Sequence, residues 1–287
     1  MKRIKYTLVL LCSLPFWLGS CETVVELDEP THTPKLILNA VINPDSLFTV
    51  DLSASQSAFS NEPYAPVKNA TVGVFSAGNH LFDLRHKANG IYQAQIKPQA
   101  GQQYELKASA NGYPSVSAIN DVPTAPTIHS IQVVGGWTAT PSSWGPSVQL
   151  TFALEDAAEQ EDFYYIQVYT PDTSHFSNNK PYNKALGFTF IAPIEAEFSM
   201  EGRHFFSDKL FNGQSLKLKL NLGNNPNKIT YVRVAHVSAE YYQYVRTLGK
   251  QYNPDLILTP QVPVLNNIQN GMGLFAGYNA ITLPIKP

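Results

Sequence analysis

Residues 216–222, LKLKLNL, decide the fold class, because apolar and polar side chains alternate along the whole stretch. Successive side chains of a β-strand point to opposite faces, so the four leucines would share one face and the lysines and Asn221 the other. The same period of two recurs in VQLTFAL at 148–154 and in YELKASA at 104–110. Strands that each bury one face are typical of antiparallel sandwiches.

Runs of this kind predict two groups of strands separated by a proline-rich stretch. The interval 113–127 contains Pro114, Pro123 and Pro126 and has no periodicity, so we interpret it as a linker. We expect an all-β protein, with an immunoglobulin-like or transthyretin-like sandwich over 35–112 and a second β-sandwich-like domain over 128–287. The predicted strands are 36–43, 47–55, 70–77, 79–84, 91–96 and 102–110 in the first group, and 128–134, 148–155, 163–170, 186–192, 214–222, 229–237 and 274–283 in the second.

One α-helix is expected near 238–252, inside the second domain. Ser238 can cap its N-terminus, Glu240 suits the first turn, and Asn253-Pro254 ends it. An apolar stripe recurs at helical spacing and predicts packing against the sheet, with a tyrosine-lined ligand site as the alternative. The stripe consists of Tyr241, Val245, Leu248 and Tyr252.

The N-terminal residues 1–20 have the layout of a secretory signal: a basic start, an apolar run from Tyr6 to Leu18, and then small residues. Leu18, Gly19, Ser20 and Cys21 resemble the bacterial lipobox, in which the cysteine is lipidated and becomes the first mature residue. The alternative is an ordinary secretion signal followed by a chance cysteine. Residues 21–34 then form the lipid anchor and a polar tether.

A lipid on Cys21 would hold an otherwise soluble chain on a bilayer, because two or more acyl chains anchor a protein stably. We therefore expect a location at the cell outer membrane, with the periplasmic face and the cell surface both open. Glu22 and the acidic tether resemble the surface-export signals of such lipoproteins. The other cysteine, Cys12, would leave with the signal, so no disulfide or thiolate site is expected.

Composition argues against several classes of function. The formal net charge is −2, and cleavage of the signal would make the chain more acidic, so nucleic acid is not an expected partner. The sequence contains no HExxH, GxSxG, P-loop or CxxC motif. We therefore predict no cofactor and no enzymatic activity.

Two loops remain as candidate sites. The acidic stretch 155–162, EDAAEQED, could offer Glu155, Asp156, Glu159 and Asp162 to calcium, although charges at a hairpin tip are normally only solvated. The turn-rich stretch 135–147 carries Trp137 and Trp144. These two tryptophans form a candidate binding surface, or they cover a sheet edge.

Several stretches together resemble one family, in the same order along the chain. They are the lipobox, PKLILNAVI, PVKNATVGVF, YELKASANGYPSVSAINDVP, FFSDKLFNGQ, SAEYYQYVRTL and NNIQNGMGLFAGY. The chain is similar to the domain-of-unknown-function family 4249, lipoproteins of Bacteroidota often encoded beside a TonB-dependent outer-membrane receptor. The resemblance implies an N-terminal β-sandwich, a second β-rich domain, outer-membrane residence and an accessory role to a nutrient receptor.

The family's NIxNGxG stretch corresponds here to Asn267, Ile268, Asn270, Gly271 and Gly273. Glycine adopts positive φ and asparagine bonds nearby backbone, so a structural signature is favoured over a ligand site. We hypothesise a non-catalytic, lipid-anchored protein that binds a receptor or a nutrient. A carboxylate-based hydrolase, for example one acting on glycans, and a structural or adhesive module are the alternatives.

Overall fold

The computed structural model describes residues 32–57, 59–134, 148–157, 160–177, 180–222, 229–251 and 262–285. The chain divides into a large compact unit, Pro34–Gln56 with Asn61–Pro287, and a small unit, Met1–Thr33 with Ser57–Ser60. The signal, the lipobox, Cys21 and the two tryptophans of 135–147 lie outside the described residues, as does Glu159. Predictions about them stay predictions.

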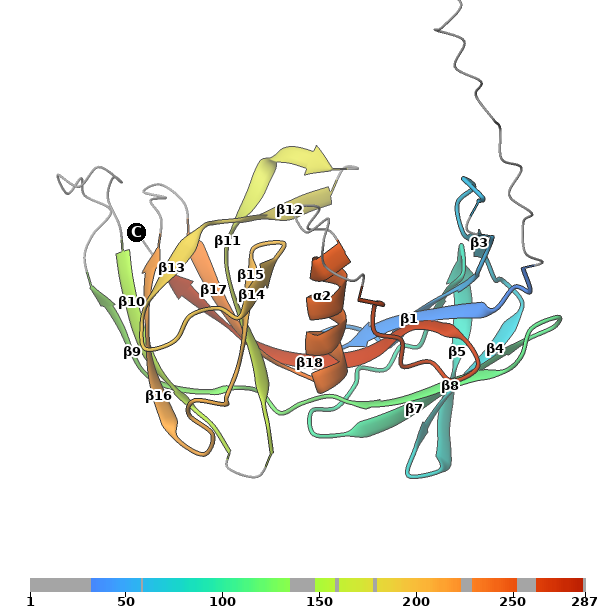
Figure 1. Cartoon of the computed structure of the whole chain (residues 1–287), viewed down its shortest axis with the longest axis horizontal. Helices are drawn as coiled ribbons and strands as arrows, with labels where there is room; N and C mark the ends of the chain where they lie inside the picture. Colours follow the sequence, from blue (N-terminus) through green and yellow to red (C-terminus); the bar gives the residue numbers. More distant parts are fainter. Residues whose placement is uncertain are drawn as a thin grey trace, which may run out of the picture. The chain divides into compact units, whose positions relative to one another are not determined.

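The chain is an all-β sandwich protein, as the period-two pattern predicts, with 57% of its residues in strands and 6% in helix. Strands of the large unit form two hydrogen-bonded sheets (Figure 1). One sheet has fourteen strands, twelve of them in the order β14-β15-β11-β17-β18-β1-β2-β6-β5-β4-β7-β8, with β12 beside β11 and β3 beside β2. The other has four, in the order β13-β16-β10-β9.

The first eight strands enclose the first hydrophobic core. Alternation places Leu36, Leu38 and Leu106 inside, each with no exposed surface. Aromatic rings complete the core, with Phe48 at 5.4 Å from Tyr104 in an edge-to-face arrangement. The strands are β1 (Leu36–Ile42), β2 (Thr49–Ala54), β3 (Ala65–Pro66), β4 (Ala70–Ser76), β5 (Asn79–Ala88), β6 (Ile91–Gln93), β7 (Gln103–Ala110) and β8 (Val116–Asp121).

The later strands form the second sandwich. The LKLKLNL stretch lies in β16, where its four leucines are buried and the residues between them are exposed. The strands are β9 (Thr127–Val134), β10 (Val148–Glu155), β11 (Phe163–Ser177), β12 (Lys180–Ala185), β13 (Phe188–Ala192), β14 (Phe198–Met200), β15 (Arg203–Ser207), β16 (Ser215–Leu222), β17 (Thr230–Val237) and β18 (Met272–Ile285).

The first part of strand β11, residues 163–170, is buried on both faces, so apolar and aromatic residues fill all but one position of FYYIQVY. Tyr164, Ile166 and Val168 face the core shared with the four-stranded sheet. Phe163 and Tyr165, between them, face the core under the helix. The sheet that contains β11 therefore lies between a second sheet on one side and the helix on the other, which explains the loss of simple alternation.

Strand β18 joins the two sandwiches. It pairs in parallel with β1, with Gly273 opposite Leu38, and antiparallel with β17, with Ile281 opposite Val234 (Figure 1). Its side chains enter all three cores: Phe275 the first, Ile285 the second, and Leu274 the core under the helix. The last described strand of the chain thus lies between β17 and β1 and connects the strands of the two sandwiches in one sheet.

The helix, α2 (Ala239–Gln251), confirms the predicted element and its cap. The Ser238 hydroxyl accepts a hydrogen bond from the Tyr241 amide at 3.4 Å, as an N-cap does. Tyr241 and Val245 of the predicted stripe are buried against the sheet, Leu248 is half-buried, and Tyr252 lies outside the described residues. Among the described residues, no helix combines the length and apolar character needed to cross a membrane.

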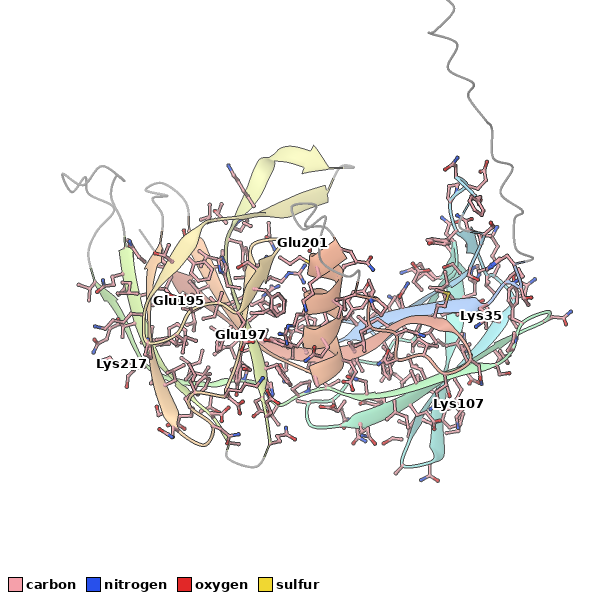
Figure 2. All side chains as sticks on the ribbon, viewed as in Figure 1. Lys35, Lys107, Glu195, Glu197, Glu201 and Lys217 are labelled. Carbon is pink, nitrogen blue, oxygen red and sulfur yellow. The ribbon has the colours of Figure 1, made fainter. Side chains whose placement is uncertain are left out.

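Tyr242 of α2 is buried, and its hydroxyl donates a 2.5 Å hydrogen bond to Glu197. Glu197, labelled in Figure 2, lies just before β14. Glu197 also accepts hydrogen bonds from the backbone and hydroxyl of Ser207. Burial alone would raise the pKa of Glu197, but the bonds from Ser207 and Tyr242 outweigh it and lower the pKa. The helix is therefore tied to the β14–β15 hairpin through a carboxylate that favours its charged form.

Tyr242→Phe should destabilise the protein by about 1 kcal/mol at pH 7. This value is small for the loss of a hydrogen bond to a charged group, because Glu197 is partly solvent-exposed. Folding lowers the pKa of Glu197 below its unfolded value of about 4.3, so the charged carboxylate stabilises the protein at pH values above 4.3. This stabilisation is lost as the pH falls through the pKa that Glu197 has in the folded protein. The difference between wild type and variant should therefore shrink at pH 3.5. Urea unfolding at both pH values measures it, and an equal difference at both would contradict the role of Glu197.

Five observed strands were not predicted from the sequence, and one of them changes the interpretation of the linker. Residues 116–121, inside the expected linker 113–127, form β8, which pairs with β7 from Val116 opposite Ala108 to Asp121 opposite Gln103. Pro114 and Pro123 flank this strand, so their lack of an amide donor does not interrupt its ladder. The other four, β3, β12, β14 and β15, are short strands at edges or beside β11. The domain limits themselves stay a prediction.

Candidate functional site

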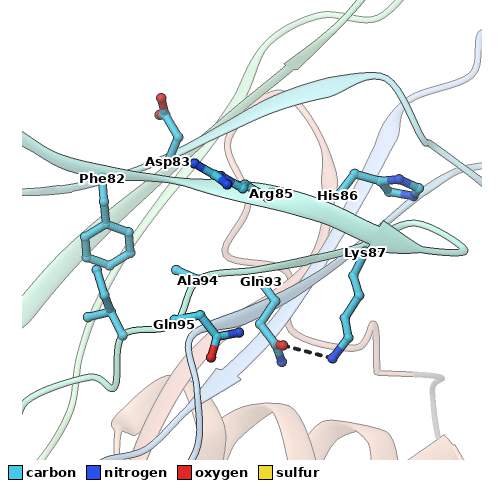
Figure 3. A pocket seen from close by; sticks show the side chains of 9 residues that line it. Phe82, Asp83, Arg85, His86, Lys87, Gln93, Ala94 and Gln95 are labelled. Carbon is cyan, nitrogen blue, oxygen red and sulfur yellow. Dashed lines mark hydrogen bonds between the residues drawn. The ribbon is translucent and has the colours of Figure 1, made fainter.

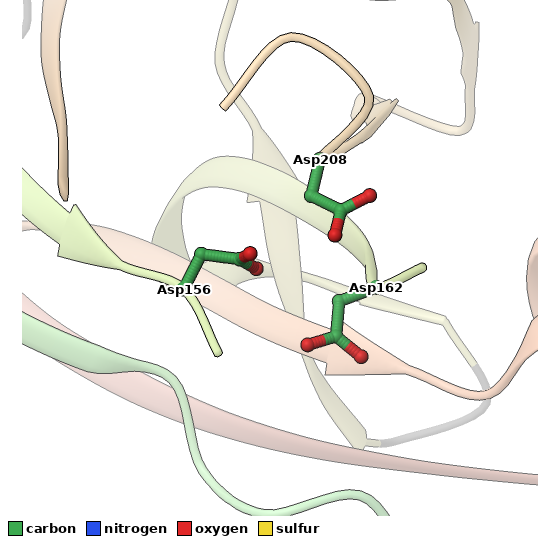
Figure 4. Close-up of side chains that lie close together, drawn as sticks. All are labelled: Asp156, Asp162 and Asp208. Carbon is green, nitrogen blue, oxygen red and sulfur yellow. The ribbon is translucent and has the colours of Figure 1, made fainter. Parts of the chain in front are cut away.

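Three aspartates from two connections meet beside the second core. Asp156 follows β10, Asp162 immediately precedes β11, and Asp208 immediately follows β15. One carboxylate oxygen from each can be chosen so that all lie within 4.8 Å of one another (Figure 4). Asp208 is thus brought to the acidic connection from about 50 residues further along the chain, by the antiparallel pairing of β11 with β15. We call these three residues the aspartate cluster.

Backbone hydrogen bonds hold the two connections together. The Asp208 amide donates to the Asp162 carbonyl at 3.0 Å, and the Gly213 amide donates to Asp156 Oδ2 at 2.9 Å. The segment 208–214 is a turn closed by the Phe211 amide on the Asp208 carbonyl at 2.7 Å. These contacts tie the backbone of the 208–214 turn to the acidic connection, and so hold the aspartates close together.

Asp208 is the most buried member of the cluster. Its exposed fraction is 0%, and neither carboxylate oxygen has a hydrogen-bond partner. Burial raises its pKa to about 6; the Asp162 main chain partly opposes this rise, and the charges of Asp156 and Asp162 add to it. A carboxylate without partners is costly to bury, so this side chain is one that a bound ligand would satisfy.

Tyr164 lies against the same cluster. Its hydroxyl donates a 2.8 Å hydrogen bond to Asp156 Oδ1, and its ring stacks on the His236 imidazole with centroids 5.0 Å apart. Burial, the bond to Asp156 and the surrounding carboxylates raise the pKa of Tyr164 strongly. The phenol therefore stays protonated at neutral pH and acts as a fixed donor.

Asp162 connects the cluster to His236 of β17. Asp162 is 4% exposed, and its Oδ1 lies 3.2 Å from His236 Nε2 and accepts from Gln160 Nε2 at 3.0 Å. The other imidazole nitrogen, Nδ1, lies 3.2 Å from the Thr124 carbonyl oxygen. Both ring nitrogens thus face an oxygen atom, and these two contacts fix the orientation of the imidazole ring beside Asp162.

A polar pocket of about 480 Å³ lies on the other side of Asp162. It is bounded by the end of β8, the connection before β11 and the start of α2. Four carboxylates line it, from Asp121, Glu161, Asp162 and Glu240. Burial, followed by the charges of Glu240 and Asp162, raises the pKa of Asp121 despite an opposing backbone hydrogen bond and the nearby His236. This pocket suits ligands that are positively charged or rich in hydrogen-bond donors.

A second hollow, of about 490 Å³, lies over the exposed face of β5 and β6 (Figure 3). Basic residues line it, including Arg85, His86 and Lys87, and Lys87 Nζ donates to Gln93 Oε1 at 3.1 Å. Lysine and arginine side chains on the exposed face of a strand are usually only solvated. We therefore assign it no ligand.

The structure brings together only part of the predicted acidic site. Asp156 and Asp162 join the cluster, whereas Glu155 points elsewhere and pairs with His129 at 3.2 Å, both about half exposed. Asp208 was missed because its only sequence signal is a single acid in the turn FFSDKLFNGQ. The number of residues between Asp208 and the acidic stretch does not indicate that they meet, because only strand pairing in the folded protein brings them together.

The NIxNGxG stretch has the structural role that the sequence favours. Asn267 exchanges two hydrogen bonds with the backbone of Phe275, at 2.6 and 2.9 Å, and Asn270 has a positive φ of 58°. Gly273, with φ of 121°, enters the parallel ladder with β1. Gly271 thus lies just before β18 and Gly273 lies within it, where a residue without a side chain allows close backbone approach.

Comparison with known proteins identifies one family. Residues 22–283 match the family model described as "Domain of unknown function (DUF4249)". No curated protein matches the chain. Among solved structures, the chain is similar to a purple acid phosphatase from yellow lupin (Lupinus luteus) seeds, at 10% identity over 73% of this chain and 38% of that chain. The TM-score of 0.18 is too low for that similarity to inform function.

Proposed function

Because the chain belongs to the family described as domain of unknown function DUF4249, we propose that it is a lipid-anchored cell-envelope protein with a binding or accessory role. In this role it assists a TonB-dependent receptor of the outer membrane in nutrient uptake. The anchor is a lipid on Cys21, placed directly after the signal-like residues 1–20. This sequence feature is the observation that carries the proposal.

The described part of the chain supports an anchored role. Its strands form a compact body with three hydrophobic cores, and no described helix can cross a bilayer. A cysteine that carries two or more acyl chains is sufficient for stable attachment of such a body to a membrane. The polar tether before β1 would hold the body away from the lipid surface.

The carboxylates support a binding role better than a hydrolytic one. A glycosidase needs two carboxyl groups that both reach the scissile bond, about 5 to 10 Å apart across a cleft. In the aspartate cluster, Asp208 has no exposed surface and Asp162 is 4% exposed, so a glycan cannot reach both. The polar pocket beside Asp162 is accessible, and its excess of carboxylates favours recognition of a ligand over acid–base chemistry at the cluster.

Co-purification tests the proposal directly. A C-terminally tagged protein, extracted with detergent from outer membranes, should bring down one TonB-dependent receptor in near-equal amount. The matched control is Cys21→Ala, which removes the lipidated thiol and leaves every described residue unchanged. This variant should lose its membrane association and, with it, the receptor.

Two outcomes would overturn the proposal. Membrane association that persists in Cys21→Ala contradicts the anchor, and a wild-type preparation without any receptor contradicts the accessory role. Neither result depends on the aspartate cluster, so the experiment is independent of any metal bound there.

A further inference from the structure

We infer that Asp156, Asp162 and Asp208 bind a hard divalent cation, with calcium the best match, and that the cation fastens the 208–214 turn to the connection before β11. This inference goes beyond the proposed envelope function. It rests on the aspartate cluster and on no feature of the N-terminus.

The geometry matches a single oxygen-coordinated ion. Calcium binds oxygen at 2.3–2.6 Å, so two oxygens on opposite sides of one ion are about 5 Å apart at most. The cluster offers one oxygen from each aspartate within 4.8 Å of one another. All three donors are carboxylates, which favours calcium or magnesium over the metals that prefer nitrogen and sulfur.

Asp208 gives the independent reason to expect a ligand. It has 0% exposed surface and no hydrogen bond to either oxygen, although its backbone amide and carbonyl are both satisfied. An unpartnered carboxylate in this setting is strongly unfavourable unless another charge compensates it. The side chains closest to it within the cluster are the two other carboxylates, which add repulsion and give no compensation.

The hydrogen bonds of the other two aspartates leave room for a metal. Asp156 accepts one hydrogen bond on each oxygen, from the Tyr164 hydroxyl and the Gly213 amide, so each oxygen keeps a lone pair. Among the described residues, the hydrogen bonds to the Asp162 side chain fall on Oδ1, from Gln160 and His236. These contacts orient the carboxylates in the way that outer-shell groups orient metal ligands.

Calcium fits better than magnesium. Calcium accepts six to eight oxygens in a flexible arrangement, whereas magnesium demands a near-octahedral geometry at 2.0–2.1 Å. Asp156 is half-buried, so water can complete the shell from that side.

Terbium luminescence tests the site, because Tb³⁺ replaces Ca²⁺ and Tyr164 lies one hydrogen bond from the cluster. The purified full-length protein, treated with EDTA and then dialysed, should show tyrosine-sensitised emission when Tb³⁺ is added, and Ca²⁺ should displace it. Calcium at millimolar concentration should also raise Tm by about 3 °C or more. We expect a dissociation constant on the order of 10⁻⁴ M, as in extracellular calcium modules.

Asp208→Asn is the decisive variant, and Glu155→Gln is its matched control. The asparagine keeps the shape of the side chain and removes the buried charge, so the metal-free variant should be at least as stable as wild type. It should lose the Tb³⁺ signal and the calcium-dependent rise in Tm. Glu155→Gln neutralises an exposed acid of the same loop, outside the cluster, and should retain both.

Three results would overturn the inference. The first is the absence of both the Tb³⁺ signal and any calcium-dependent shift in Tm up to 10 mM. The second is an equal response in wild type and Asp208→Asn. A larger shift with Mg²⁺ than with Ca²⁺ would overturn the assignment to calcium. Should Asp208→Asn fail to fold, Asp156→Asn provides the same comparison with a half-buried residue.

Discussion

Gly273→Ala is expected to destabilise the protein by about 4 kcal/mol or more, enough to leave much of the chain unfolded at physiological temperature. Gly273 has a φ of 121°, which side-chain-bearing residues rarely adopt. A methyl group there would lie 2.1 Å from the Leu38 carbonyl oxygen and 2.9 Å from Asn39 Oδ1. The carbonyl oxygen cannot retreat without disturbing the parallel pairing of β18 with β1, and the Asn39 side chain can move away only by losing its hydrogen bond from the Leu274 amide.

Variants of two other glycines distinguish the cost of backbone strain at Gly273 from the cost of its steric clash with β1. Gly78→Ala shares a positive φ of 79° but meets no atom within 4 Å, so it should cost about 1 to 2 kcal/mol, from backbone strain alone. Gly249→Ala lies in α2, meets no atom and should stabilise the protein by about 0.5 to 1 kcal/mol. Urea unfolding of the three variants measures the series. Equal costs for Gly273→Ala and Gly78→Ala would contradict the importance of the β1–β18 contact.

Phe152→Ala is expected to cost about 3 to 5 kcal/mol and to loosen both sandwiches together. Phe152 is fully buried in the second core, where truncation leaves a cavity between β10 and the facing sheet. Strand β18 supplies side chains to every core and pairs with β1 of the first sandwich and β17 of the second. A loss of packing in one sandwich is therefore transmitted to the other through a shared strand.

Hydrogen exchange distinguishes this coupled opening from independent domains. Amide protection in β2 and β4, within the first sandwich, should fall by roughly a thousandfold in Phe152→Ala, in parallel with that in β10 and β16. The control is Ile119→Ala, whose side chain is 52% exposed and should change stability by about 0.5 kcal/mol at most. Unchanged protection in β2 and β4 would show that the two sandwiches open separately.

Local patterns predicted most of the secondary structure. The predicted strand 214–222 corresponds to β16, and the predicted helix 238–252 corresponds to α2, with Ser238 as its cap. These elements were accessible because a strand or helix with one buried face leaves its period in the sequence. The strand over 116–121 was not predicted, because the prolines on either side of it indicated a linker. Strand β14 was not predicted, because its three residues are too few to show a period.

The sequence predicted only part of the candidate metal site. Two of its aspartates stood in the acidic stretch, but Glu155 of the same stretch lies outside the cluster, and Asp208 is absent from the stretch. Which acids converge depends on the pairing of β11 with β15, a long-range contact that neighbouring residues do not encode. Burial of Asp208, the strongest indication of a ligand, is likewise a property of the assembled fold.

By itself, the sequence determined the all-β class, the positions of most strands and the capped helix, and it predicts the signal over residues 1–20 before Cys21. All of these follow from periodicity or from short contiguous motifs, which depend on residues close together in the chain. Only the tertiary structure decided that β18 closes the sheet beside β1, that Gly273 requires its positive φ, and that three aspartates meet. These features arise where segments far apart in the sequence come into contact, so they depend on packing and strand pairing across the whole chain.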